Sequence, residues 1–161
     1  MAKAPRLGER LPDFNLPGGR LIEGTFARRD YTLSGSRGRP VVLAFYPGDN
    51  TTVCTKQLCS YMSGFERFTE LGAEVWGISP QGVDSHEEFA RRHGLSFPLL
   101  ADEDRSVARA FAVAAPGTGL RRAVFVVSPA GELHWKHVAL LGVTFQSVDT
   151  IAEQLGALTA N

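Results

Sequence analysis

The chain has 161 residues, of which 43% are hydrophobic and 21% charged, and its 17 basic and 17 acidic side chains give a formal net charge of zero. This length and composition are typical of one globular domain, so we expect a single domain over residues 1–161. The balanced charge offers no footprint for nucleic acid, and no apolar run is long enough to cross a bilayer, so we expect neither nucleic acid nor a membrane as a partner.

The first part of the chain is rich in turn residues and leads into short apolar segments. Between Pro12 and Gly24 we expect short strands or a hairpin that lies over the core through Leu11, Phe14 and Leu16. The central strands are predicted at residues 41–46, 73–78 and 123–127. Each is apolar on both faces, as in a sheet covered on both sides. A turn then precedes an antiparallel strand at 133–138.

Helical segments separate these strands. They are predicted at residues 55–71, 85–93 and 104–111. Ser85 and Glu88 have the spacing of a capping box at the start of the second. A C-terminal helix is indicated by one apolar stripe, formed by Val148, Ile151, Leu155 and Leu158. The alternation predicts an α/β fold: a central mixed sheet flanked by helices, with an N-terminal strand or hairpin extension.

The two cysteines of the chain, Cys54 and Cys59, follow the first central strand. In such sheets functional sites lie beyond the carboxyl ends of strands. Cys54 falls in the first turn of a helix that we expect to open at Thr51. Amides there have no partner within the helix and the helix dipole favours negative charge, so a thiol at such a position is more often the reactive thiolate. A lone buried cysteine is usually a small hydrophobe, but the helix start, the Thr51 hydroxyl and the second cysteine favour a reactive one.

The spacing of the cysteines has a mechanical consequence. Residues five apart on an ideal helix lie roughly 140° apart around the axis and about 7.5 Å apart along it, which places their Cα atoms roughly 8–9 Å apart. A disulfide requires about 7 Å or less. Bonding between Cys54 and Cys59 would therefore need this segment to unwind, which suggests a thiol that reacts first and a partner that reaches it after local unfolding. With no hydrophobic signal segment at the start of the sequence, the pair is interpreted as reduced and redox-active, and the cytoplasm is the expected location.

At this point the residues resemble a known family. Pro47, Thr51 and Cys54 fit the PxxxTxxC signature of peroxiredoxins, and Cys59 fits the bacterioferritin comigratory protein, or peroxiredoxin Q, subgroup. Five segments are similar to the family in the same order: LPDFNLP, FYPGDNTTVCTKQLC, VWGISPQ, FPLLADED and RRAVFVVSPAGEL. Two positions differ, since Thr52-Val53 stands where Pro-Gly is common and Gln57 where an acidic residue is common. The resemblance implies a thioredoxin-like fold and a thiol peroxidase, as a monomer or weak dimer.

The resemblance also implies roles for particular residues. Cys54 would attack a peroxide and become a sulfenic acid, and Cys59 would resolve it as an intramolecular disulfide, recycled by a thioredoxin-like reductant protein. Thr51 would bind the thiolate or the peroxide, and Pro47 would shape the pocket. The family's arginine matches Arg122. Adjacent strand residues face opposite sides, so only one of Arg121 and Arg122 can face Cys54, and we favour Arg122.

Other functions are less well supported. The sequence lacks a GxGxxG or P-loop motif, and its four histidines are scattered, so we expect no nucleotide, cofactor or metal. A non-catalytic redox sensor or binding protein, switched by the same disulfide, remains an alternative that turnover with a reductant would distinguish. A thioredoxin-like disulfide oxidoreductase is disfavoured because there is no CxxC. Cys59 could also be only a packing residue on the apolar helix face with Leu58 and Phe65.

Overall fold

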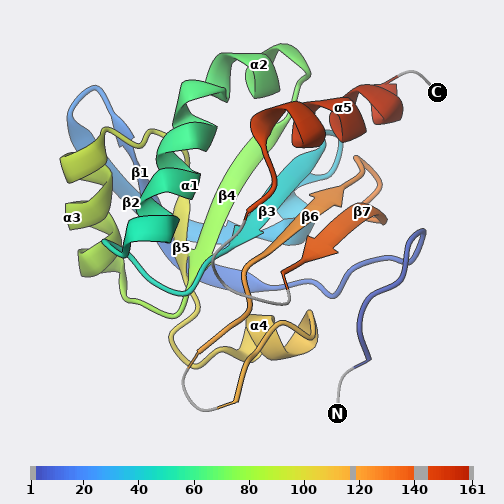
Figure 1. The fold of residues 1–161 in the computed structure, drawn as a ribbon, viewed down its shortest axis with the longest axis horizontal. Helices are drawn as coiled ribbons and strands as arrows, with labels where there is room; N and C mark the ends of the chain where they lie inside the picture. The colour runs from blue at the N-terminus through green and yellow to red at the C-terminus, as the bar shows by residue number, and fades with distance from the viewer. Residues whose placement is uncertain (1–2, 117–118, 140–144, 160–161) are drawn as a thin grey trace.

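The computed structural model describes residues 3–116, 119–139 and 145–159, and it contains a seven-stranded sheet with helices on both faces (Figure 1). The strands are β1 (Asn15–Ile22), β2 (Thr25–Thr32), β3 (Val41–Phe45), β4 (Glu74–Ser79), β5 (Leu99–Ala101), β6 (Ala123–Val127) and β7 (Leu133–Val138). The helices are η1, a 3-10 turn (Leu33–Ser36), α1 (Thr52–Ser63), α2 (Phe65–Glu70), α3 (Val83–His93), α4 (Ser106–Ala110) and α5 (Val148–Thr159). The predicted α/β class and mixed sheet are confirmed.

The strand order shows where the loop after β3 leaves the sheet. It is β2-β1-β5-β4-β3-β6-β7. The pairs β3–β4 and β4–β5 are parallel, whereas β2–β1, β1–β5, β3–β6 and β6–β7 are antiparallel. The five residues of β3 are fully buried, which agrees with their apolar sequence. Because β3 lies between β4 and β6, the loop that follows it opens at the middle of the sheet.

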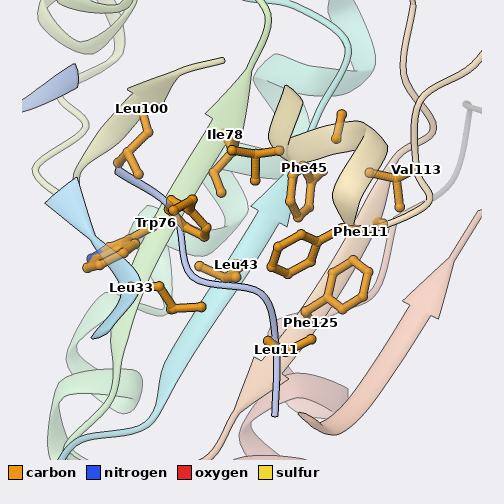
Figure 2. Close-up of a cluster of buried hydrophobic side chains, with 14 of the residues drawn as sticks. Leu11, Leu33, Leu43, Phe45, Trp76, Ile78, Leu100, Phe111, Val113 and Phe125 are labelled. Carbon is orange, nitrogen blue, oxygen red and sulfur yellow. The ribbon is translucent and has the colours of Figure 1, made fainter. Parts of the chain in front are cut away.

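Two hydrophobic layers cover the two faces of the sheet. Figure 2 shows the layer beneath α4, where Phe45, Phe111 and Phe125 pack edge-on or tilted with ring centroids 5.2–5.6 Å apart. The predicted N-terminal contacts Leu11, Phe14 and Leu16 join this layer. The other layer lies beneath α1, α2, α3 and α5, and it contains Cys54. The alternation of side chains along β3 thus sends one set of residues to the aromatic layer and the other to the layer of the cysteine.

The prediction of one continuous helix over residues 55–71 is wrong. The helix starts at Thr52 and is interrupted at Gly64, after which α2 begins. A Cβ on Gly64 would lie 2.5 Å from Cγ1 of Val148 on α5, so only glycine allows this close approach. The break therefore follows from contact with a helix 84 positions further along the chain, which local propensity does not reveal.

The capping box predicted for Ser85 and Glu88 is also wrong. Helix α3 begins two residues earlier, with Gly82 as its N-cap. The Ser85 hydroxyl instead donates to the Asp49 carboxylate at 2.7 Å. A buried acceptor on the neighbouring loop has replaced the backbone amide as the partner of this serine.

Strand β5 was not predicted from the sequence, and it connects the N-terminal hairpin to the central sheet. Its pairing with β1 is short, through Gly18 with Leu100 and Gly19 with Leu99. A Cβ on Gly18 would lie 2.5 Å from the Leu99 carbonyl oxygen. The two backbones can approach this closely only because β1 has glycine where it pairs with β5.

We therefore expect Gly18→Ala to destabilise the protein, whereas Gly35→Ala should not. The added methyl at Gly18 overlaps backbone that cannot turn aside, and such overpacking costs roughly 1–3 kcal/mol of unfolding free energy. A Cβ on Gly35 meets no atom within 4 Å. Urea unfolding of both variants provides the measurement, and equal midpoints for the two would contradict the close approach of β1 and β5.

Candidate active site

The loop after β3 places Cys54 in the first turn of α1. Cys54 is fully buried, beneath the start of the helix. The helix's hydrogen-bond ladder begins with Thr55 N donating to Thr51 O at 2.9 Å. The amides of Thr52, Val53 and Cys54 precede that bond and have no partner within the helix, so their dipoles favour negative charge at this end.

Arg122 brings a cation to the sulfur. It precedes β6, its side chain is 3% exposed, and its Nη2 donates to Cys54 Sγ at 3.2 Å. Its Nη1 donates to Gln57 Oε1. Arg121 is exposed. The arginine that contacts the cysteine is thus Arg122, because neighbouring residues of an extended chain face opposite sides. A guanidinium at this distance stabilises an anionic sulfur.

A chain of hydrogen bonds extends from Arg122 to the start of α5. Gln57 is fully buried, and its Nε2 donates to the Tyr61 hydroxyl oxygen at 3.1 Å. That hydroxyl donates to the Gln146 carbonyl at 3.0 Å. Burial raises the pKa of Tyr61 to about 12, so the hydroxyl keeps its proton for the carbonyl. Because an amide both donates and accepts, Gln57 satisfies Tyr61 and Arg122 together, which a carboxylate could not do with Tyr61 in this orientation.

Thr51 and Pro47 lie on the loop that leads to Cys54. Thr51 occupies the N-cap position of α1 with an extended backbone, and its hydroxyl donates to the Gly48 carbonyl at 3.2 Å. The side chain therefore does not cap the helix, and its oxygen lone pairs remain able to accept a hydrogen bond. Thr51 is exposed and Pro47 is half-buried.

Cys59 lies further along α1, and both cysteines are free thiols. Its side chain is partly buried and packs against the hydrophobic layer that contains Cys54. Burial raises the pKa of the Cys59 thiol. The two sulfurs thus differ: Cys54 contacts a guanidinium, whereas Cys59 has an apolar environment that favours the neutral thiol.

Sequence reasoning missed the partners of Gln57. It identified Gln57 only as a departure from the family pattern and assigned no role to Tyr61 or Gln146. The four-residue spacing of Gln57 and Tyr61 on a predicted helix was a usable signal, because such residues are neighbours on one face. The contact with Gln146 depends on tertiary packing and had no local signal.

Within residues 3–116, 119–139 and 145–159, no group of three or more histidine, cysteine, aspartate or glutamate side chains could hold a metal ion. In the same part of the chain, no helix combines the length and apolar character needed to cross a membrane.

Comparison with known proteins agrees with this geometry. The model of the AhpC/TSA family matches residues 7–136, which is most of the chain. The chain belongs to the AhpC/TSA family. Peroxiredoxin Bcp of Bacillus subtilis (strain 168) is 30% identical over 158 residues, which cover 91% of this chain and 95% of that protein. The family and this relative identify the chain as a peroxiredoxin similar to the Bcp and peroxiredoxin Q proteins.

Other relatives and solved structures extend the comparison. The chloroplastic peroxiredoxin Q of Oryza sativa subsp. japonica is 41% identical over 109 residues, covering 66% of this chain and 50% of the relative. The chain thus matches about half the length of such relatives. The peroxidoxin BcpB of Mycobacterium tuberculosis has 29% identity and a TM-score of 0.78, with 97% of both chains covered. AhpC of Mycobacterium bovis, 23% identical, has a TM-score of 0.86 over 98% of this chain and 94% of its own, which shows the shared thioredoxin-like peroxiredoxin fold.

The contact between Arg122 and Cys54 should determine how fast the sulfur reacts with peroxide. Arg122→Ala should slow oxidation of Cys54 by peroxide by about 10²–10³-fold, as expected when a charge-stabilising donor is lost. Arg121→Ala is the matched control and should have little effect, because Arg121 is exposed. Stopped-flow oxidation by hydrogen peroxide measures both rates. Greater damage from Arg121→Ala would contradict the assignment.

The role of Gln57 is testable through stability. Gln57→Leu should lower the free energy of unfolding by about 1–3 kcal/mol, because it removes two buried hydrogen bonds, the one that Arg122 donates to Gln57 and the one that Gln57 donates to Tyr61. Gln57→Glu should lower it less, since a carboxylate still accepts from Arg122 and the Tyr61 hydroxyl can turn its proton toward it. Urea unfolding of the reduced proteins measures the difference. A leucine variant as stable as wild type would exclude this role.

Proposed function

We propose that this chain is a thiol peroxidase that reduces hydrogen peroxide and organic hydroperoxides. The observation that supports it most directly is the 3.2 Å contact from Arg122 Nη2 to Cys54 Sγ at the N-terminus of α1. A cationic donor and the first-turn amides both favour the thiolate, which is the nucleophilic form. Membership of the peroxiredoxin family supports the same chemistry.

The first step would oxidise Cys54 by two electrons. Its thiolate attacks the terminal oxygen of the peroxide, an S–O bond forms, and the O–O bond breaks. The electron pair leaves on the distal oxygen as hydroxide or alkoxide, which takes up, through solvent, the proton that the Cys54 thiol released on ionising and so becomes water or an alcohol. Arg122 and the first-turn amides stabilise the developing charge. The Thr51 hydroxyl can accept a hydrogen bond from the peroxide proton, and Pro47 narrows access to the sulfur.

The second step would form the intramolecular disulfide. The Cys59 sulfur attacks the Cys54 sulfenic acid, an S–S bond forms, and the hydroxyl leaves as water with the proton of Cys59. This step requires α1 to unwind, because residues five apart on a helix are too distant to bond. A dithiol protein of the thioredoxin type would then supply two electrons by thiol–disulfide exchange. A cytoplasmic location and a monomeric or weakly dimeric state stay predictions.

Peroxide consumption with a thioredoxin system tests the proposal. Cys54→Ser should abolish turnover, because it removes the sulfur that the Arg122 guanidinium contacts at the start of α1. Cys59→Ser should react once and then stop, since its sulfenic acid has no resolving thiol within the chain. Mass spectrometry of oxidised wild type should find a bond between Cys54 and Cys59.

The alternatives give distinct results in the same assay. Wild type that is oxidised once but does not turn over with any dithiol reductant would indicate a redox sensor. Continued turnover by Cys54→Ser would refute the peroxidase assignment, and a disulfide found only between chains would refute the intramolecular step.

A further inference from the structure

A second group of polar side chains lies buried behind the loop that leads to Cys54. At its centre is Asp49, 6% exposed, whose carboxylate contacts three side chains. The Tyr46 hydroxyl donates to Oδ1 at 2.7 Å, and the Ser85 hydroxyl donates to Oδ2 at 2.7 Å. His86, which is fully buried, places Nδ1 2.7 Å from Oδ2. The Asp49 amide also donates to Gln81 Oε1. None of these residues has a role in the proposed peroxide chemistry.

The hydrogen-bond partners of His86 require Asp49 and His86 to share an additional proton. His86 Nε2 lies 3.0 Å from the Leu100 carbonyl oxygen, which can only accept, so Nε2 carries hydrogen. A neutral imidazole has only one N–H, so its Nδ1 would face the carboxylate with a lone pair. The 2.7 Å contact therefore needs a second proton, either on Nδ1 or on the carboxyl group. In both forms the pair has no net charge, which suits a site where both side chains are buried away from water.

Tyr46 adds to the same arrangement. Burial raises its pKa well above the ordinary value, and the Asp49 charge raises it further, so Tyr46 keeps its proton and donates it to the carboxylate. Asp49 thus has partners on three segments: Tyr46, which directly follows β3, Gln81 in the loop before α3, and two residues of α3 itself. A surface loop is thus fixed to the sheet through one aspartate.

This aspartate lies two residues before Thr51, the N-cap residue of α1. The next residue, Asn50, has a positive φ of 63°, a conformation that asparagine tolerates but that other contacts must maintain. Thr51 follows, bonded back to Gly48, and Cys54 is three residues further on. A short stretch of backbone thus connects the buried contacts of Asp49 to the first turn of α1.

We propose that Asp49 and His86 are positioning residues that hold the loop from Pro47 to Thr51 so that the first turn of α1 stays wound around Cys54. The inference rests on the proposed peroxidase function. Peroxide attack needs the wound helix, with its amides and Arg122 beside the sulfur. Disulfide formation needs the same turn to unwind. Weakening the Asp49 contact should thus slow the first step and speed the second.

The experiment compares Asp49→Ala with Asp49→Asn in single-turnover oxidation by hydrogen peroxide. Alanine removes the contact, and peroxide oxidation of Cys54 should slow by about tenfold or more, as small displacements of reacting groups commonly cause. Disulfide formation, followed by quenched thiol labelling and mass spectrometry, should become faster. Asparagine can accept from Tyr46 and donate to Nδ1 of a neutral His86, so both rates should stay near those of wild type. Asp84→Ala, an exposed aspartate in the first turn of α3, is the control and should change neither rate.

Each outcome decides the question. Equal rates in Asp49→Ala and wild type would overturn the proposal. Slow peroxide oxidation in Asp49→Asn would also overturn it, because the charge of the carboxylate, and not the position that its contacts maintain, would then control the rate. If the alanine variant fails to fold by circular dichroism, Ser85→Ala replaces it, since it removes one hydroxyl from Oδ2. In Ser85→Ala, peroxide oxidation of Cys54 should again become slower and disulfide formation again faster, both by smaller factors. Unchanged rates in this variant would overturn the proposal. Failure of the peroxidase function is distinguishable, because wild type itself would then not be oxidised at Cys54.

Discussion

A guanidinium excluded from water has to be surrounded by acceptors, and at this site α1 supplies two of them. Arg122 donates one N–H to the Cys54 sulfur and another to the Gln57 side chain. Cys54 and Gln57 are three residues apart, so they lie on the same face of the helix. One cation therefore sets the rotation of α1 about its axis relative to β6. The position of the cysteine above the sheet follows from that contact as much as from apolar packing.

Polar contacts hold α1 at several points along its length. Asp49 contacts His86 from the loop before it, and Tyr61 connects its last turn to the Gln146 carbonyl before α5. The exposed ion pair between Arg67 and Asp149 also joins α2 to α5, although a pair in contact with solvent contributes little. The buried contacts matter more, because a donor or acceptor left unpaired in the interior is costly. A helix that is proposed to unwind is thus held by a few specific bonds that can be broken one at a time.

Much of this arrangement could be predicted from sequence patterns, and the exceptions share a cause. The bounds of β6 follow from its apolar run, and those of β7 from the turn that precedes it. The resemblance to the family favours Arg122, and the alternation of extended residues then excludes Arg121. The break at Gly64, the short strand β5 and the partner of Ser85 do not follow from such patterns, because each depends on a residue distant in sequence: Val148, Gly18 and Asp49 respectively. His86 was considered only as a metal ligand. Its partner Asp49 lies 37 positions away, so the buried pair had no pattern within a single element.

In the proposed resolving step, the break at Gly64 limits the part of the helix that has to unwind. Helix α2, which follows Gly64, packs against α5 and can stay in place while α1 unwinds. Only four residues separate Cys54 from Cys59, so the two sulfurs stay on a short tether. Closing so short a loop has a small entropic cost, and a short flexible tether gives an effective concentration on the order of millimolar or above. A second peroxide molecule must instead arrive by diffusion from solution. In the proposed mechanism, an oxidised Cys54 therefore reacts either with the tethered Cys59 at this fixed local concentration or with a second peroxide at the external concentration. Irreversible oxidation then gains on disulfide formation as the external concentration rises.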